Sequence, residues 1–342
     1  MTVAGDYEAA ARARLESAVF DYFAGGSDDE FSVNDNHSAW QRIRLRPRVL
    51  RDVSTIDMAT TLLGSAVAAP IAIAPMAAHG LVHDDGELAT AEGVAAAQML
   101  YTVSTMATRG MEDIAAVARG APRWFQLYVR GDLDGARPLV ERAEAAGYSA
   151  LMVTVDVPTL GLRRHEGISL ERRVVLAHLP SAGPQGGVYD RHVALTFDDL
   201  ATIVSWSGLP VLAKGVLRAD DAAACVRAGV AGIVVSNHGG RQLDTTVDPP
   251  TALAEVAAAV GDVAEIYVDG GIRRGTDIVK AVALGADGVL VGRPVIWGLA
   301  ADGAEGVRAV LEELRSELER AMKLCGARTL ADLTPDLVVA PF

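Results

Sequence analysis

Residues 210–237 read PVLAKGVLRADDAAACVRAGVAGIVVSN. The apolar runs at 210–215 and 232–237 predict two strands that are buried on both faces, because polar residues do not alternate within them. The alanine-rich stretch between them ends in glycine, which predicts an amphipathic helix that stops before the second strand. A strand, a helix and a second strand in this order indicate a parallel pair joined by a right-handed crossover.

The same strand-and-helix pattern recurs along the chain. Short apolar runs lie at 70–75, 101–106, 123–129, 150–156, 210–215, 232–237, 265–271 and 288–294. Eight such units over roughly 225 residues predict an α/β protein with a closed (β/α)8 barrel, a TIM barrel, whose usual length is about 250 residues. An open, doubly wound sheet is the alternative, although its GxGxxG fingerprint after the first strand is missing.

The segments around these units are expected to belong to one domain that spans residues 1–342. The N-terminal part predicts a helix over Tyr7–Phe23 and a second, short helix near Asn34–Trp40. A long charged helix is predicted at 303–324. The expected divisions are a short N-terminal helical cap (1–69), the barrel (70–300), a lid rich in Pro and Gly after the fourth strand (164–195), and a C-terminal helix and tail (301–342).

Composition excludes several classes of partner and site. The formal net charge is −13, from 31 basic and 44 acidic residues, and no polybasic run occurs. An acidic surface repels phosphate backbones, so nucleic acid is not an expected partner. Cys225 and Cys325 lie far apart without CxxC spacing. We therefore expect buried helical cysteines, no disulfide scaffold and no metal site.

The N-terminus and the hydropathy pattern indicate a cytoplasmic protein. The first residues, MTVAGDYEAAARARLE, contain early acids and no long apolar stretch, unlike a signal peptide. No window reaches the roughly 18 uninterrupted apolar residues of a membrane-spanning helix. A membrane is therefore not an expected partner.

Polar residues follow nearly every predicted strand. In a barrel of this kind, chemistry takes place at the carboxyl ends of the strands. One polar loop residue needs no function, but a polar group at nearly every strand end indicates a site. These ends carry Pro75-Met76-Ala77, Ser104, Gln126, Tyr128, Thr154, Asp156, Lys214, Ser236, His238, Asp269-Gly270-Gly271 and Gly292-Arg293.

The last two strands are followed by a candidate anion site. The seventh runs into DGGIRRGTD, and the eighth ends in GRP before a helix. Glycines let backbone N–H groups approach an oxyanion, and Arg273 and Arg293 can clamp it. The loops after strands seven and eight commonly hold phosphate in these barrels. The alternative is that DGG only forms a tight turn.

Lys214 and His238 are the candidate chemical groups. A lysine in the barrel mouth can form a Schiff base or can offset negative charge on a cofactor. A histidine at a strand end can act as a base near neutral pH, and Asp156 can orient its ring. Arg241, which follows Gly239-Gly240, can bind a carboxylate in bidentate fashion. The pattern indicates proton removal from a molecule that carries a carboxylate, although a purely structural histidine is also compatible with it.

The motif SNHGGRQLD (236–244), with LAKG, DGGIRRGTD and GRPV, resembles the FMN-dependent L-2-hydroxy acid oxidases and dehydrogenases. That family includes glycolate oxidase, lactate oxidase, mandelate dehydrogenase and 4-hydroxymandelate oxidase. The resemblance also covers VFDYFAGG (19–26), RLRPRVLRDV (44–53), APMA, FQLYV and TVDVPTLG, and therefore nearly the whole chain. SNHGGRQ is highly specific, whereas GRPV alone is not.

The resemblance implies FMN as the cofactor and a role for each matching residue. Lys214 resembles the lysine beside the flavin N1–C2 carbonyl, where reduction builds negative charge. On the substrate side it implies His238 as the base, Asp156 as its partner, Arg241 and Tyr22 on the substrate carboxylate, Tyr128 near the substrate hydroxyl, and Arg163 (or its neighbour Arg164) as a second arginine. On the cofactor side it implies Pro75, Met76, Ala77, Ser104, Gln126, Thr154 and Ser236 at the flavin ring, and Asp269, Gly270, Gly271, Arg273, Gly292 and Arg293 at the ribityl phosphate.

The sequence departs from the family pattern at two places. Met106 stands where glycolate oxidases carry tryptophan, and a flexible thioether there gives room for a larger substrate side chain. The loop after the fourth strand is shorter than in most members. It also lacks the long apolar insert by which membrane-bound mandelate dehydrogenases attach. Together these features predict a soluble enzyme that passes electrons to oxygen or to another acceptor, and the family resemblance implies a homotetramer or octamer.

The expected activity is therefore that of an FMN-dependent (S)-2-hydroxy-acid oxidase. Its substrate is expected to be mandelate-like, with a bulky or aromatic side chain, and its products a 2-oxo acid and hydrogen peroxide. One alternative is an FMN-dependent dehydrogenase that uses another acceptor or an unusual substrate. More remote alternatives are an FMN-type isopentenyl-diphosphate isomerase, a Schiff-base aldolase that uses Lys214, and a barrel that only binds or assembles.

Overall fold

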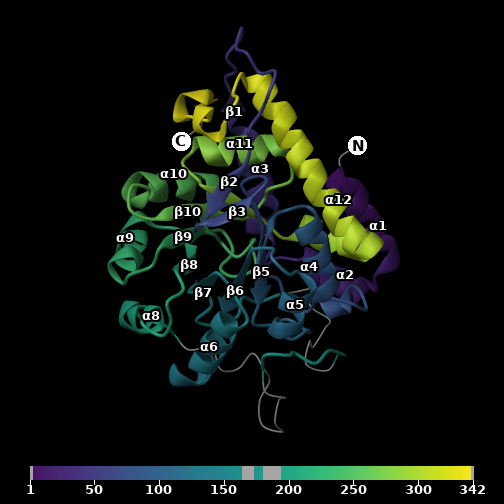
Figure 1. Cartoon of the computed structure of the whole chain (residues 1–342), viewed down its shortest axis with the longest axis vertical. Helices are drawn as coiled ribbons and strands as arrows, with labels where there is room; N and C mark the ends of the chain where they lie inside the picture. The colour runs from purple at the N-terminus through teal and green to yellow at the C-terminus, as the bar shows by residue number, and fades with distance from the viewer. Residues whose placement is uncertain (1–2, 164–172, 180–193, 340–342) are drawn as a thin grey trace.

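Eight parallel strands form a closed barrel (Figure 1). The computed structural model describes residues 3–163, 173–179 and 194–339. Neighbouring strands pair in the order β10-β11-β4-β5-β6-β7-β8-β9, so the last barrel strand in the chain lies beside the first. The predicted (β/α)8 fold is confirmed. The barrel strands are β4 (Ile71–Ile73), β5 (Leu100–Ser104), β6 (Arg123–Leu127), β7 (Ala150–Thr154), β8 (Val211–Val216), β9 (Gly232–Val235), β10 (Glu265–Val268) and β11 (Gly288–Val291).

Helices follow the barrel strands and pack around them. Local signals set several of their ends: Thr196 and Asp199 form a capping box at the start of α8, and Asp248 accepts the Thr251 N–H at the start of α10. The outer helices are α4 (Glu87–Ala96), α5 (Met111–Val117), α6 (Arg137–Ala145), α8 (Phe197–Val204), α9 (Ala219–Arg227), α10 (Pro249–Val260), α11 (Gly275–Ala283) and α12 (Arg293–Cys325).

Large side chains fill the barrel interior. Trp124 and Tyr267 meet edge to face there, with ring centroids 5.2 Å apart. A hairpin that the sequence did not predict, β2 (Thr60–Leu62) and β3 (Ser65–Val67), adds its buried Leu62 to this cluster. The amino-terminal end of the barrel is therefore closed by packing, and chemistry is confined to the carboxyl end.

The N-terminal cap consists of α1 (Val3–Arg14), α2 (Ser17–Ala24) and α3 (Phe31–Arg42). The predicted single helix over Tyr7–Phe23 is wrong, because Glu16 adopts an extended conformation (ψ 141°) and separates α1 from α2. The predicted helix near Asn34–Trp40 is confirmed and is longer at both ends. These helices place Tyr22 and Asn36 beside the barrel mouth.

The last long helix, α12, begins directly after the eighth barrel strand. The helix predicted at 303–324 is its second part, which follows a break at Asp302 and Gly303. Both cysteines are buried on helices, as predicted, with Cys225 on α9 and Cys325 at the end of α12. Beyond α12 the chain returns as β12 (Val338–Val339), which pairs antiparallel with β1 (Arg44–Leu45).

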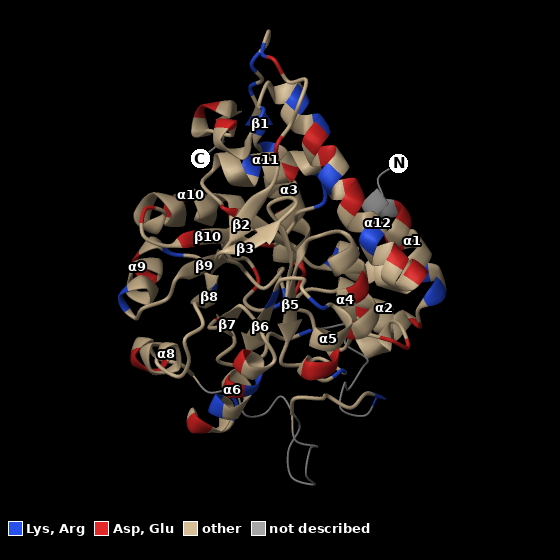
Figure 2. Cartoon of the chain, viewed as in Figure 1, with Lys and Arg blue, Asp and Glu red and all other residues tan. Residues whose placement is uncertain are grey.

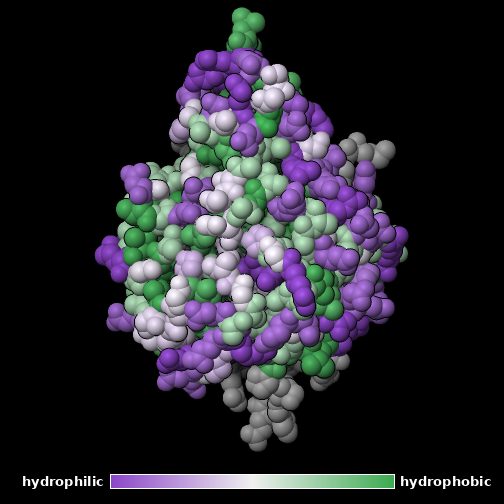
Figure 3. Space-filling model, viewed as in Figure 1, coloured by the Kyte–Doolittle hydropathy of each residue, from purple (hydrophilic) through white to green (hydrophobic). Residues whose placement is uncertain are grey.

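The outer surface is polar and mixed in charge. Figure 2 shows acidic and basic residues alternating along α12, and Figure 3 shows hydrophilic residues over much of the outer helices on this face. Among the described residues, no helix is both long enough and apolar enough to cross a membrane. Of the predicted lid, 164–172 and 180–193 lie outside the described residues.

Candidate functional site

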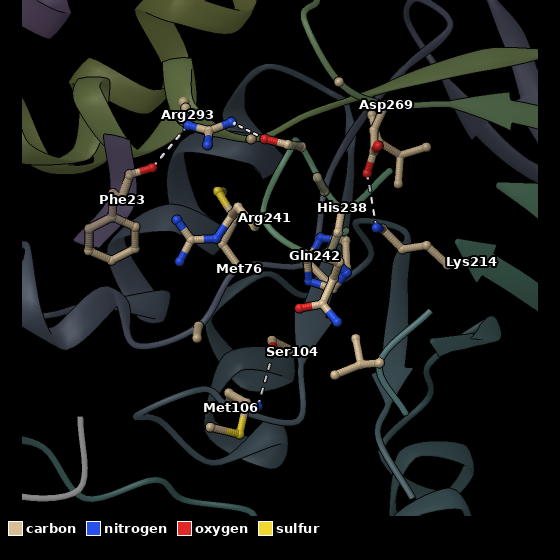
Figure 4. Close-up of a pocket in the computed structure, with 18 of the residues that line it drawn as sticks. Phe23, Met76, Ser104, Met106, Lys214, His238, Arg241, Gln242, Asp269 and Arg293 are labelled. Carbon is tan, nitrogen blue, oxygen red and sulfur yellow. Dashed lines mark hydrogen bonds and ion pairs between the residues drawn. The ribbon is translucent and has the colours of Figure 1, made fainter. Parts of the chain in front are cut away.

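A pocket opens at the carboxyl ends of the barrel strands, where the sequence places its polar residues (Figure 4). The predicted residues Gln126, Ser236 and Asp156 are not part of its lining but bond to residues that are, and Thr154 bonds to Gln126. The alternative residue Arg164 lies outside the described residues. The predicted residues that line the pocket are Tyr22, Pro75, Met76, Ala77, Ser104, Met106, Tyr128, Arg163, Lys214, His238, Arg241, Asp269, Gly270, Gly271, Arg273, Gly292 and Arg293.

A chain of polar contacts runs across the ends of neighbouring strands. Ser104 on β5 donates to Gln126 Oε1 at 3.1 Å, and Gln126 Nε2 donates to Thr154 Oγ1 on β7 at 3.0 Å. Further round the barrel, Lys214 Nζ donates to Ser236 Oγ at 2.9 Å and pairs with Asp269 Oδ2 at 3.0 Å. These buried polar groups are matched to one another, which fixes the floor of the pocket.

His238 begins a left-handed turn after β9. Its φ is 59°, and Gly239 and Gly240 follow with φ of 65° and 75°. A side chain on Gly240 would place its Cβ 2.4 Å from the backbone N of Val33, so the glycine also permits close approach of the cap. The turn is further fixed by the His238 N–H, which donates to Ser236 Oγ at 3.0 Å. The glycine pair thus turns the chain sharply, so that both the imidazole and the later Arg241 face the pocket.

The His238 ring lies between a carboxylate and a phenol. Its Nδ1 is 3.0 Å from Asp156 Oδ1 and its Nε2 is 3.4 Å from the Tyr128 hydroxyl. Burial raises the pKa of Asp156. The attraction and hydrogen bond of His238, together with the charge of Lys214, lower it by more, so the net pKa lies below its ordinary value. An ionised Asp156 holds the proton of the neutral ring on Nδ1 and leaves Nε2 as the basic atom. Gly215 makes room, because a Cβ there would lie 2.4 Å from Asp156 Cγ.

Two arginines and two tyrosines surround the space in front of His238. Arg241 Nη1 donates to the carbonyls of Tyr22 and Gly25 at 2.6 and 3.0 Å, which fixes its guanidinium at the pocket. The guanidinium carbons of Arg241 and Arg163 lie 5.1 and 6.0 Å from the centre of the Tyr22 ring. Burial is the main cause of a raised pKa at Tyr128, and the nearby Asp156 and Tyr22 add to it electrostatically, so the hydroxyl keeps its proton. The arrangement suits a small carboxylate with a neighbouring hydroxyl.

The other end of the pocket concentrates buried positive charge. Arg293 donates to the carbonyls of Phe23, Gly25 and Gly239 at 2.9–3.1 Å. Burial, with repulsion from Arg241 and Arg273, lowers the pKa of Arg293 to about 9. Burial also lowers the pKa of Arg273. Charges held together at this cost indicate a site for an anion.

Three polar residues support the site without having been assigned a role from the sequence. Gln242 joins the loops after β7 and β9, because its Nε2 donates to the carbonyls of Asp156 and Thr159 and its Oε1 accepts the Gly161 N–H. Asn36 and Asn237 exchange two amide hydrogen bonds of 2.7 and 2.8 Å. The motif GGRQ contains Gln242, but nothing in its spacing reveals these partners.

The model of the family described as FMN-dependent dehydrogenase matches residues 11–340. This chain belongs to that family. The FMN-dependent dehydrogenase family includes proteins of different names that resemble this chain to a similar degree over nearly their whole length. A mouse 2-hydroxyacid oxidase 2 is 44% identical, with 97% of each chain covered, and an L-lactate oxidase from a Nostoc species is 45% identical, with 96% of this chain and 95% of the relative covered. A rice glycolate oxidase 1 is 43% identical, with 96% and 93% covered.

Solved structures of mandelate oxidase share the fold. One has a TM-score of 0.91 at 42% identity, with 96% of each chain covered. Another, described as mandelate oxidase with (S)-4-hydroxymandelic acid, has a TM-score of 0.91 at 41% identity and 96% coverage of each chain. The relatives therefore establish a family of 2-hydroxy acid oxidases, and the acid named differs from one relative to the next.

FMN is the cofactor of this family, and the pocket fits it. Asp269 Oδ1 is buried and accepts no hydrogen bond from any residue that the structure describes, so a hydroxyl donor from a ligand would satisfy it. Gly270 and Gly271 have φ of 86° and 83°, and a Cβ on Gly271 would lie 2.2 Å from the Asn36 carbonyl oxygen. The orphaned carboxylate oxygen lies in the same pocket as the buried arginines, which matches a phosphorylated polyol chain.

Proposed function

We propose that this protein oxidises an L-2-hydroxy acid with a bulky or aromatic side chain, such as mandelate, to the 2-oxo acid, with oxygen as the acceptor and hydrogen peroxide as the second product. The observation that carries the proposal is the placement of His238, which Asp156 backs, in one pocket with Tyr128, Arg241 and Arg163. FMN, when bound, accepts the two electrons that the substrate loses.

At the substrate end, some residues bind the substrate and others transfer its proton. We propose that the substrate carboxylate binds Arg241 and Tyr22, because Arg241 is fixed by two backbone carbonyls and faces the pocket. His238 Nε2 then takes a proton, and Asp156 stabilises the imidazolium that forms. Tyr128, whose raised pKa keeps its hydroxyl protonated, donates to the substrate hydroxyl oxygen. Arg163 adds a second positive charge on the same side.

The cofactor end is assigned in the same way. We propose that Pro75, Met76, Ala77, Ser104, Gln126, Thr154 and Ser236 surround the flavin ring. Arg273, Arg293, Gly270, Gly271 and Gly292 hold the phosphate, and Asp269 Oδ1 accepts from the ribityl chain. Lys214 supplies positive charge next to the ring. Its amine is already engaged by Asp269 and Ser236, which argues against the Schiff-base alternative.

The preference for a bulky side chain rests on Met106. Met106 is 4% exposed and lines the pocket, and its Sδ lies 3.8 Å from Arg130 Nη1. A thioether adapts its shape more easily than a flat ring does. We propose that Met106 makes room for the substrate's side chain, which disfavours glycolate.

The proposal is tested by oxygen consumption and peroxide formation with L- and D-mandelate, L-lactate and glycolate. We expect turnover of L-mandelate and little of the D-isomer. His238→Ala should lower turnover by about 10²–10⁴-fold or more while FMN stays bound. His83→Ala, which removes a partly exposed histidine outside the pocket lining, serves as the control and should keep normal turnover. Near-normal turnover of His238→Ala would refute the role of His238 as base.

A further inference from the structure

Residues 173–179 form a short segment that packs against the loop after β5. The N–H of Ala177 donates to the carbonyl of Ala107 at 2.9 Å. Leu176, which is 6% exposed, belongs to the same apolar cluster as the pocket residue Met106. The segment therefore backs the wall against which we place the substrate's side chain.

His178 anchors this segment in an apolar setting. It is 6% exposed and meets the Phe125 ring edge to face, with centroids 5.5 Å apart. Neither ring nitrogen hydrogen-bonds to any residue within the described parts of the chain. The backbone of Ser104 and Thr105 lies near the ring and favours its charged form, although neither residue hydrogen-bonds to the ring nitrogens. A buried polar atom without a partner costs about 1–3 kcal/mol, so an apolar residue would anchor the segment more tightly.

The charged groups around His178 come from two outer helices. Arg142 on α6 and Glu112 on α5 form a two-bond ion pair of 2.9 and 3.0 Å beside it. On the segment itself, Arg173 pairs with Glu16 at the surface. Burial and then Arg142 lower the pKa of His178, and they outweigh the opposite effects of the two carbonyls and Glu112. The packed position therefore accepts the neutral ring and resists the charged one.

We propose that His178 is a positioning residue: its neutral ring holds residues 173–179 against the pocket wall, and its protonation in acid releases them. The packed state binds the proton more weakly than the released state. Packing is therefore at full strength above about pH 6.5, the ordinary histidine value, and weakens by up to about tenfold for each pH unit below it. The effect on substrate, which rests on the proposed function, is that Leu176 no longer supports Met106 and KM for a bulky acid rises.

The first test needs no substrate. The chain has seven histidines, so the FMN-loaded protein labelled with ¹³C-histidine gives seven ring signals. The signal missing in His178→Phe belongs to His178. We expect it to titrate below the ordinary value of about 6.5, and the protection of the Ala177 amide from exchange to fall over the same pH range. Titration at or above that value, or constant protection of the amide, would overturn the proposal.

The second test compares pH profiles. We measure kcat/KM for L-mandelate from about pH 8 down to about pH 5 and divide the wild-type value by that of His178→Phe. This ratio should stay constant down to about pH 6.5. It should then fall by up to about tenfold per unit below about pH 6.5, mainly through KM. Parallel profiles of the two proteins would contradict the proposal. His83→Phe, which removes a partly exposed histidine outside the pocket lining, should follow the wild-type profile.

Two further measurements separate the possible failures. If His178→Phe does not fold, His178→Leu provides the same assignment and the same profile. If no 2-hydroxy acid is turned over, the proposed function fails, while the ring titration and the Ala177 exchange still decide the role of His178.

Discussion

His238 Nδ1 lies 3.0 Å from Asp156 Oδ1, although the two residues are 82 positions apart in the chain. The pair forms because the loops after β7 and β9 end at the same face of the barrel, and Gln242 holds the two loops together. It gives the imidazole one defined tautomer and a partner for its charged form. The proposed role of His238 as a base depends on this contact.

Asp156→Asn should leave the ring in place and remove the charge that supports it. Because an amide stabilises the imidazolium poorly and can bind the wrong tautomer, we expect kcat to fall by about 10²–10⁴-fold. The absorption spectrum should show that FMN remains bound. Asp113→Asn, at an exposed position on α5, is the matched control. A loss of less than about tenfold in Asp156→Asn would remove Asp156 from the mechanism.

The buried pair of Lys214 and Asp269 should show strong coupling in stability. Removing one partner leaves the other charge buried, which costs about 3–5 kcal/mol. The double variant Lys214→Met/Asp269→Asn should cost less than the sum of Lys214→Met and Asp269→Asn by about 1–3 kcal/mol. Urea unfolding of the protein without FMN measures all four forms. Additive costs would mean that the pair does not act as one unit.

Met106→Trp should change the choice of substrate. A rigid bicyclic side chain fills the space that we assign to the substrate's own side chain. The ratio of kcat/KM for L-mandelate to that for glycolate should therefore fall by at least about tenfold. Met106→Leu keeps a similar volume and should keep the ratio within a few-fold. An unchanged ratio in Met106→Trp would show that the side chain of the substrate lies elsewhere.

Gly240 and Gly64 allow strain and overlap to be measured separately. Both have φ of 75°, but a Cβ on Gly64 would meet no atom within 4 Å, whereas on Gly240 it would lie 2.4 Å from Val33 N. Gly64→Ala should cost about 1–2 kcal/mol of unfolding free energy from conformation alone. Gly240→Ala should cost about 1–3 kcal/mol more because the cap must move. Equal costs would show that the cap yields freely at this point.

The barrel could be predicted because its strands are buried on both faces. Each apolar run between helical stretches marks one strand, and the closed order follows from right-handed crossovers. The hairpin β2–β3 was missed because its strands have three residues each, too few for a period to show. The break at Glu16 was missed because neither glycine nor proline marks it.

The site could be predicted as a set of residue types at strand ends but not as a set of contacts. His238, Asp156 and Lys214 could be placed at the mouth because all strands of a parallel barrel end on one face. The contact between Asn36 and Asn237 joins residues 201 positions apart, and a single sequence carries no signal for it. The division into a single domain with a lid stays a prediction, as do the homotetramer or octamer and the cytoplasmic location.

The most direct test of the central claim is the visible spectrum of the purified protein, recorded without oxygen before and after L-mandelate is added. We expect flavin bands that bleach with L-mandelate, bleach much less with glycolate, and persist in His238→Ala. Flavin bands that bleach with none of L-mandelate, L-lactate and glycolate would leave the fold and the cofactor in place and would contradict the proposed oxidation of a 2-hydroxy acid.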